Sequence, residues 1–271
     1  MTGWPVQRVE VGALRITVLP LGEIYDDQRR WFPTGSLAVA GGETRLPVNC
    51  LHVGGPGISV LIDACDPPCY PETGSAGGSI GQRLEEAGIS PGGITHILLT
   101  HGHHDHFCGV AGPGNEPAFP TARHVLPPQD WADGTLTPEA QRADGDAADP
   151  ASLEMLYRRG LLDLGESAVP LPEEIRLLDA PGETAGHRVV RVSSDGEVLY
   201  FLADLFHVAA EIADPGLCPW WADAAALKAS RSRIISAMRR GNARFLCSHI
   251  SGVLSPDLFP DFSASPCETS A

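Results

Sequence analysis

The segment from Thr100 to His106 carries the densest set of chemically active side chains in the sequence. It reads Thr-His-Gly-His-His-Asp-His, so four imidazoles and one carboxylate fall within six residues. Burying unpaired imidazole and carboxylate groups costs free energy, and a plain polar loop has no use for them. Together these groups suit a divalent metal such as zinc or iron. Because imidazoles are mostly unprotonated near neutral pH, they are free to coordinate.

The position of this segment explains how its side chains reach metal. Residues 94–99 are a near-continuous apolar run, which is typical of a strand covered on both faces, and the histidines follow at once. A loop at the end of a strand points alternate side chains in different directions. We therefore expect His101 and His103 to face one ion, and Asp105 and His106 to face a second.

The remaining elements form two similar halves around an irregular middle. Runs rich in β-branched residues predict strands, and helical spacing with terminal caps predicts helices. The predicted strands are 14–19, 49–53, 59–62, 94–99, 122–126, 175–178, 188–192, 198–202 and 245–247, and the predicted helices are 79–87, 152–159 and 222–240. We interpret 31–47 as a loop, 111–150 as an irregular insertion and 252–271 as a C-terminal tail. Two sheets packed face to face with helices outside satisfy this order in one domain, residues 1–271.

The histidine segment resembles the His-x-His-x-Asp-His hallmark of the metallo-β-lactamase superfamily, and later elements follow in that family's order. His187 ends a Pro-Gly-x-Thr-x-Gly stretch, Asp204 ends a strand, and His249 follows a strand near the C-terminus. Upstream, Asp63 ends an apolar strand, as in the family. The resemblance covers nearly the whole chain. It implies an α+β fold with four layers, αββα, in which two packed mixed β-sheets have helices outside.

The resemblance also implies a site for two metal ions, expected to be two Zn²⁺, with iron or manganese as alternatives. The first ion is expected on His101, His103 and His187, and the second on Asp105, His106 and His249, with Asp204 bridging the two. Asp63 is expected to accept a hydrogen bond from a ligand imidazole, with loop capping as the alternative. Among the other histidines, His104 is expected to point away from the metals, and structural roles are expected for His52, His96 and His124.

Such a site implies hydrolysis by a metal-bridging hydroxide, because two ions that share a water lower its pKa toward about 7. Asp105 or Asp204 is expected to take up and return the proton. The segment 203–210 is similar to the methyl parathion hydrolase and lactonase branch, so a small organic ester or lactone is the expected substrate. His207 stands where well-known homoserine-lactone lactonases carry a tyrosine. We expect it to steady the oxyanion or the leaving group, with a purely structural hydrogen bond as the alternative.

Other chemistries stay open at this point: a thioesterase, a phosphotriesterase, or a diiron oxidoreductase on the same fold. The net charge of −15, from 34 acidic and 19 basic residues, argues against nucleic acid and favours a small-molecule substrate. No apolar run approaches the roughly 20 residues of a membrane span, and seven irregularly spaced cysteines indicate free thiols, so we expect a cytoplasmic protein without a membrane partner. The oligomeric state is open, with a homodimer as one alternative. Specificity is expected to lie in the loops 23–47 and 111–149 and in the C-terminal tail.

Overall fold

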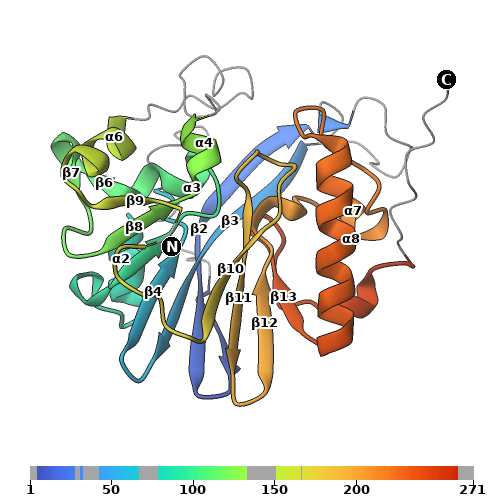
Figure 1. Ribbon diagram of the computed structural model, residues 1–271, viewed down its shortest axis with the longest axis horizontal. Coiled ribbons are helices and arrows are strands. Elements are labelled where there is room, and N and C mark those ends of the chain that lie inside the picture. Colours follow the sequence, from blue (N-terminus) through green and yellow to red (C-terminus); the bar gives the residue numbers. More distant parts are fainter. Residues whose placement is uncertain are drawn as a thin grey trace.

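The computed structural model describes residues 5–27, 31–32, 43–66, 79–132, 151–165 and 167–261 of the 271-residue chain. Two β-sheets face one another at the centre of the molecule, and helices cover the outer face of each sheet (Figure 1).

The larger sheet has seven strands in the order β1-β2-β3-β4-β5-β8-β9. The first four are antiparallel neighbours, whereas β4, β5, β8 and β9 run parallel to one another. Their bounds are β1 Gln7–Val11, β2 Leu14–Asp27, β3 Glu43–Gly55, β4 Ile58–Ile62, β5 His96–Leu98, β8 Arg123–Leu126 and β9 Leu162–Leu164. Because parallel strands end at the same edge of a sheet, the residues that follow β4, β5 and β8 are brought together.

The smaller sheet has four strands in the order β10-β11-β12-β13. Their bounds are β10 Ile175–Asp179, β11 Arg188–Ser194, β12 Glu197–Phe201 and β13 Arg244–Leu246. A hairpin joins β11 to β12 through Asp195 and Gly196, whose φ angles are 49° and 83°. Two positive φ angles in a two-residue turn match the twist of a hairpin. Only β13 runs parallel to its neighbour, so β12 and β13 end at one edge.

Alternating side chains on the strands build three apolar layers. In β5, Leu98 points between the two sheets, while Ile97 points toward the helices α2 (Ile80–Glu86) and α6 (Ala151–Arg158). In β12, Leu199 and Phe201 lie between the sheets, and Tyr200 packs toward the helix α8 (Ala224–Gly241). This is the period-two alternation of a strand, applied to sheets covered on both faces. The four-layer αββα arrangement expected from the sequence is confirmed.

Three longer helices cover the sheets: α2 Ile80–Glu86, α6 Ala151–Arg158 and α8 Ala224–Gly241. Ser79 caps α2 in a capping box with Gln82, and Asp223 caps α8 by accepting from two backbone amides. The short helices are α3 His104–Phe107, α4 Pro128–Ala132 and α7 Ala209–Ala213, and the 3₁₀ turns are η2 Pro91–Gly93, η3 Cys108–Val110, η4 Pro113–Asn115, η5 Ala203–Leu205 and η6 Pro256–Leu258.

Two predictions from the sequence were wrong in detail. The segment 31–47 is not all loop, because β3 starts at Glu43 and pairs with the far half of β2 as far as Asp27. Cross-strand pairing with a long neighbour outweighs the weak strand propensity of these residues. Residues 111–132 hold more regular structure than the one predicted strand, 122–126, which is present as β8: they also form the small hairpin of β6 Ala111–Gly112 and β7 Glu116–Pro117, with η4 between its strands, and the helix α4. Residues 133–150 and 262–271 lie outside the described residues.

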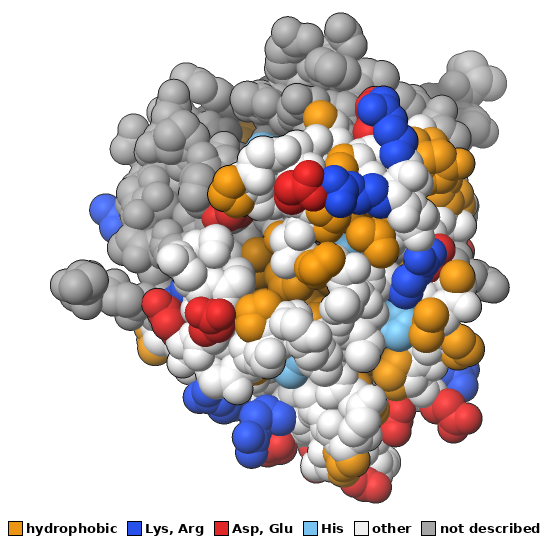
Figure 2. All heavy atoms as spheres, turned by 90° about the vertical axis from the view of Figure 1, so that its left-hand side faces the viewer, with side chains coloured by type: hydrophobic (Ala, Val, Ile, Leu, Met, Phe, Trp, Pro, Cys, Tyr) orange, Lys and Arg blue, Asp and Glu red, His pale blue; other side chains and the backbone are white. Residues whose placement is uncertain are grey.

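The described surface mixes charges of both signs. Figure 2 shows acidic and basic side chains interspersed with apolar ones on the face at the left of Figure 1. No helix in the described part of the chain is long and apolar enough to cross a membrane. Five described cysteines are free thiols: Cys50, Cys65, Cys108, Cys218 and Cys247.

Candidate metal centre

The candidate site lies where the parallel strands of both sheets end. In the larger sheet, Asp63 follows β4 and His101 comes shortly after β5. In the smaller sheet, Asp204 follows β12 and His249 follows β13. The backbone is unusual at two of these strand ends, since φ is 59° at Asp63 and 47° at Ala203. Left-handed backbone at non-glycine residues is held only where surrounding contacts fix it, and such positions cluster at functional sites.

A single helical turn, α3, presents the second half of the histidine segment. His103 has extended backbone just before this turn, and Asp105 and His106 lie inside it. The turn is tied to the end of β4, because Ala64 N donates to His106 O at 2.8 Å. This change from extended to helical backbone sends His103 in one direction and the Asp105–His106 pair in another.

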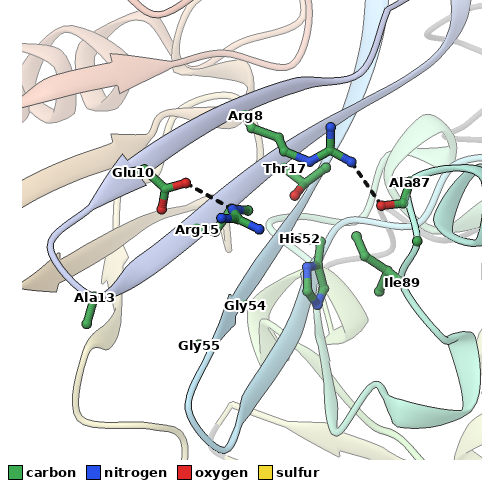
Figure 3. A pocket seen from close by; sticks show the side chains of 11 residues that line it. Arg8, Glu10, Ala13, Arg15, Thr17, His52, Gly54, Gly55, Ala87 and Ile89 are labelled. Atoms are coloured by element: carbon green, nitrogen blue, oxygen red, sulfur yellow. Dashed lines mark hydrogen bonds and ion pairs between the residues drawn. The ribbon is translucent and has the colours of Figure 1, made fainter.

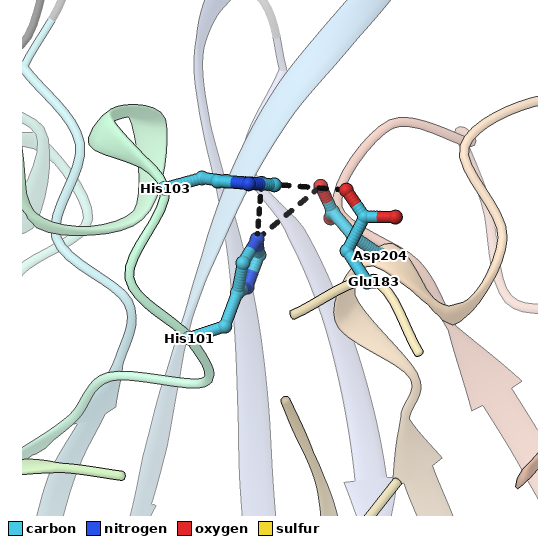
Figure 4. Close-up of side chains that lie close together, drawn as sticks. All are labelled: His101, His103, Glu183 and Asp204. Carbon is cyan, nitrogen blue, oxygen red and sulfur yellow. Dashed lines mark hydrogen bonds and ion pairs between the residues drawn. The ribbon is translucent and has the colours of Figure 1, made fainter. Parts of the chain in front are cut away.

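Two groups of ligand-type side chains result, and in each the ligand atoms lie within 4.8 Å of one another. The first group is drawn in Figure 4 and consists of His101, His103, Glu183 and Asp204, and the second consists of Asp105, His106, Asp204 and His249. Asp204 belongs to both groups. Six of the seven ligands predicted from the sequence are therefore brought together, and Glu183 joins them.

The second group has the donor spacing of a tetrahedral metal site. His249 Nε2 lies 3.1 Å from Asp105 Oδ2 and 3.2 Å from Asp204 Oδ2. His106 Nε2 lies 3.5 and 3.2 Å from the same two oxygens. A tetrahedral ion with bonds of about 2.0–2.2 Å separates its donors by roughly 3.3–3.6 Å. All four distances are close to this range.

The first group is spaced similarly. His101 Nε2 is 3.0 Å from His103 Nδ1, and His103 Nδ1 is 3.3 Å from Glu183 Oε1. His101 Nε2 is 3.8 Å from Asp204 Oδ2. These distances bracket the separation expected of donors around one ion.

Outer hydrogen bonds orient the imidazoles. His106 Nδ1 donates to Asp63 Oδ2 at 2.8 Å, and His249 Nδ1 donates to Pro47 O at 2.9 Å, so both rings turn Nε2 inward. Asp63 is itself fixed, because it accepts from Thr100 N at 2.8 Å and from Thr100 Oγ1 at 3.0 Å. Such partners set the tautomer of a metal-binding histidine. The hydrogen bond expected between Asp63 and a ligand imidazole is confirmed.

His187 lies beside the first group but belongs to neither. Its ring centroid is 5.1 Å from that of His101, its Nδ1 donates to Ala180 O at 3.0 Å, and its Nε2 accepts from Asp204 N at 3.2 Å. Complete burial lowers the pKa of His187 to about 4, so its ring stays neutral. Its role as a ligand of the first metal remains a prediction.

The charge balance of the site calls for cations. Burial by itself raises the pKa values of Asp105 and Asp204, but His106 and His249 outweigh it and hold both values well below the usual range. Burial lowers the pKa of His249, yet Asp204 and Asp105 raise it to about 10. The carboxylates are thus ionised and attract positive charge, which His106 and His249 supply in the metal-free protein and which divalent ions would supply in their place.

Two buried carboxylate oxygens also lack partners. Asp204 Oδ1 and Glu183 Oε2 have no hydrogen-bond partner in the described part of the chain. A buried charged oxygen without a partner is costly, and a metal bond removes that cost. With the donor set and its spacing, these atoms show that the residues present fit divalent metal ions.

His207 lies against the shared aspartate. Its Nε2 is 3.5 Å from Asp204 Oδ2 and 3.2 Å from Glu183 Oε1, so it reaches a ligand carboxylate as expected. Its Nδ1 faces Glu211 Oε2 at 3.3 Å, and Glu211 also pairs with the buried Arg231. Only 3% of His207 is exposed, so it does not stand at an open mouth. Its ring lies edge-on to that of Trp31, and its Nδ1 is hydrogen-bonded to Glu211 on the side away from the metal ligands.

Three buried acids near the site were missed at the sequence level. Glu183 and Glu211 lack a motif of their own, although Glu183 lies within the Pro-Gly-x-Thr-x-Gly stretch. The third, Asp130 on α4, accepts from Gly102 N at 2.8 Å, Thr184 Oγ1 at 2.8 Å and Gly186 N at 2.6 Å. It thereby joins the histidine segment to the loop that carries His187. The only sequence signal for Asp130 was its place shortly after a predicted strand.

The other histidines lie outside both groups. His104 sets its ring edge against Phe107, with 5.6 Å between centroids. His52 Nε2 is 3.0 Å from Ser59 Oγ, His96 Nε2 donates to Val169 O at 3.1 Å, and His124 is completely buried.

A separate pocket of about 360 Å³ lies at the opposite end of β4, beside Gly55 and Ala87 (Figure 3). Its arginines already have partners, because Arg8 donates to Ala87 O and Arg15 pairs with Glu10. None of the pocket's lining residues belongs to either metal group.

Comparison with known proteins agrees with this geometry. The family model of the metallo-beta-lactamase superfamily matches residues 44–249. Among solved structures, AidC, a dizinc quorum-quenching lactonase in complex with a homoserine product, is 22% identical, with a TM-score of 0.77 over 95% of this chain and 98% of its own. The hydrolase AbOPH is 19% identical, with a TM-score of 0.77 over 93% and 92%. A probable metal-dependent hydrolase from Staphylococcus aureus is 19% identical, with a TM-score of 0.75 over 89% and 91%. No curated protein matches the sequence.

The matched region contains the smaller sheet, the larger sheet from β3 onward, and every residue of the two ligand groups. The chain belongs to the metallo-β-lactamase superfamily. It is a metal-dependent hydrolase of that superfamily, with a site for divalent metal between its two sheets.

Proposed function

We propose that this protein is a dinuclear zinc hydrolase that opens small organic esters or lactones. The observation that carries the proposal is the pair of ligand groups that share Asp204, since a shared carboxylate holds two ions close together. Two such ions, when bound, would lower the pKa of a water between them and polarise the carbonyl bond whose carbon is attacked.

The side chains divide this task between them. We assign His101, His103 and His187 to the first ion, Asp105, His106 and His249 to the second, and Asp204 to both. Asp204 and Asp105 also lie where they can take up the proton of the attacking water and return it to the leaving group. In this proposal the second-ion ligands are already spaced for one tetrahedral ion.

His207 has the position of a hydrogen-bond donor to the substrate. Glu211 fixes its Nδ1 side, which leaves Nε2 directed at Asp204 and Glu183. From there a small shift of the ring brings the donor to a developing oxyanion or a leaving oxygen. Trp31 and Trp221 cover the ring on two sides, with centroids 5.7 Å away in each case, and exclude water from it.

An uncharged or weakly charged small substrate fits this setting best. The chain carries a net charge of −15, which disfavours a polyanion. The fold neighbours include a lactonase with a homoserine product bound, and this supports an ester or lactone as the first class to test. We propose a cytoplasmic enzyme on the grounds of the free thiols.

The test is a substrate panel with zinc-loaded protein: aryl esters, lactones, phosphotriesters and thioesters. We expect the highest kcat/KM on an ester or a lactone. The matched control is Asp105→Asn, purified in the same way, which should lose at least about 100-fold in kcat/KM because it lacks a ligand and a proton acceptor. An undiminished rate in this variant would show that the activity does not come from this site. A preference for phosphotriesters or thioesters, or a coloured protein that holds iron and oxidises its substrate, would contradict the proposal.

A further inference from the structure

Glu183 is a buried acid that reaches the metal centre from a rigid loop. It follows Gly182, whose φ is 140°. Gly182 packs directly against the backbone of Leu227 in α8, so that a residue with a Cβ would not fit at this position. The next residue, Thr184, is tied to Asp130 by a hydrogen bond of 2.8 Å. The Glu183 side chain is 1% exposed. Its position is therefore set by the backbone on both sides.

The carboxylate of Glu183 lies among the donors of the first ion. Its Oε1 is 3.3 Å from His103 Nδ1, and Figure 4 shows it on the same side of the imidazoles as Asp204. Donors bound to one tetrahedral ion at about 2.0–2.2 Å lie roughly 3.3–3.6 Å apart. Glu183 is thus spaced from His103 as a fellow ligand would be.

The two oxygens of Glu183 have different surroundings. Oε1 accepts from Trp221 Nε1 at 2.7 Å and lies 3.2 Å from His207 Nε2. Oε2 is buried and has no hydrogen-bond partner within the described residues. An ionised carboxylate offers about four acceptor positions, and leaving one of its oxygens buried and unsatisfied is costly. A purely structural acceptor for Trp221 explains Oε1 and leaves Oε2 unexplained.

We propose that Glu183 is a direct ligand of the first metal ion, in addition to the ligands assigned to it above, His101, His103, His187 and Asp204. The inference rests on the two-metal site proposed above, and it adds a third carboxylate to the two aspartates around the ions. A carboxylate is a harder ligand than imidazole, so Glu183 makes the first site more accommodating to manganese or iron than a site of histidines alone.

The test compares Glu183→Gln with Trp221→Phe. The first variant removes the charge and keeps the size of the side chain, whereas the second removes only the indole N–H that holds Oε1. Zinc affinity is measured by competition with a chelator, and the visible absorption of the Co²⁺-loaded protein reports the ligands directly. We expect Glu183→Gln to lose at least about tenfold in affinity for one of two ions and to change the cobalt spectrum, because a ligand affects binding at least as strongly as its outer partners do. Trp221→Phe should keep both ions and the spectrum.

Equal zinc affinities and unchanged cobalt spectra in the unmodified protein and Glu183→Gln would overturn the proposal. Should Glu183→Gln fail to fold, a crystal structure of the unmodified protein soaked in zinc decides. A Glu183 oxygen within about 2.0–2.2 Å of the ion supports the proposal, and a carboxylate outside the coordination sphere refutes it. These results are independent of the substrate panel: a loss of metal affinity with no hydrolysis of esters or lactones would leave Glu183 a ligand and end the proposed function.

Discussion

The hydrogen bond from His106 Nδ1 to Asp63 Oδ2 leads to a specific prediction about metal affinity, because it orients a proposed ligand of the second ion. We expect Asp63→Asn to weaken binding of the second ion without unfolding the protein. Asparagine tolerates the left-handed backbone at this position, where φ is 59°. Its carbonyl oxygen can still accept from Thr100 N, which now donates to Asp63 Oδ1 at 2.8 Å.

The change acts through the tautomer of His106. Asp63 Oδ2 accepts from His106 Nδ1 at 2.8 Å, which leaves Nε2 as the nitrogen that can give up its proton to a metal ion and directs it at Asp204, 3.2 Å away. The amide of asparagine puts an NH₂ group in that place, and an NH₂ group favours the tautomer with its proton on Nε2. A protonated Nε2 cannot bind metal. Loss of such an outer partner costs about 10- to 100-fold in metal affinity, or about 1.4–2.7 kcal/mol.

The measurement is a titration of metal-free protein with zinc against a competing chelator, with folding checked by circular dichroism. The matched control is Asp195→Asn, which makes the same change at another left-handed aspartate, in the hairpin turn between β11 and β12, where φ is 49°. We expect the control to bind both ions as the unmodified protein does. A folded Asp63→Asn variant with unchanged affinity for both ions would show that Asp63 only caps its loop.

Three further predictions follow from the site and the core. His187→Ala should mainly weaken the first ion and His249→Ala the second, each with at least about a 100-fold loss of activity; full metal and normal turnover in either variant would disprove that assignment. His207→Gln should keep both ions and lower kcat and kcat/KM together by about 10- to 100-fold, and an unchanged kcat in the folded, metal-loaded variant would end the catalytic role. Burial lowers the pKa of His124 from 6.5 to about 4, so the unfolded chain takes up a proton first as the pH falls below 6.5. The free energy of unfolding should therefore drop by about 1.4 kcal/mol per pH unit as the pH falls from 6.5 toward about 4. Urea unfolding at pH 7 and pH 5 measures this drop, and the free energy of unfolding of His124→Leu should fall less between the two pH values than that of the unmodified protein.

Local sequence was enough to predict the centre of the site. The segment from His101 to His106 holds five ligand-type groups in six residues, and such density has few uses apart from metal binding. Asp204 and His249 were predicted from the resemblance to the metallo-β-lactamase superfamily, in which the corresponding residues follow strands in this order. Parallel strands bring such positions to one edge whatever the details of packing.

The missed residues depend on contacts that are distant in the sequence. Glu211 is buried because Arg231, on a different helix, neutralises it. Asp130 is buried because backbone amides from two other loops converge on it. A single acid in a loop carries no sign of such partners, and the solvent-exposed alternative is the commoner one. The extent of β3 was missed for a similar reason, since its first half is specified by the neighbouring strand β2.

The central claim is that two divalent ions are held around one shared carboxylate. Elemental analysis of purified, metal-replete protein tests it most directly, with Asp204→Ala measured beside it. We predict two divalent ions per chain in the unmodified protein and a lower occupancy of both in Asp204→Ala, because Asp204 belongs to both ligand groups. One ion or none in the unmodified protein, or two ions retained in Asp204→Ala, would contradict the account.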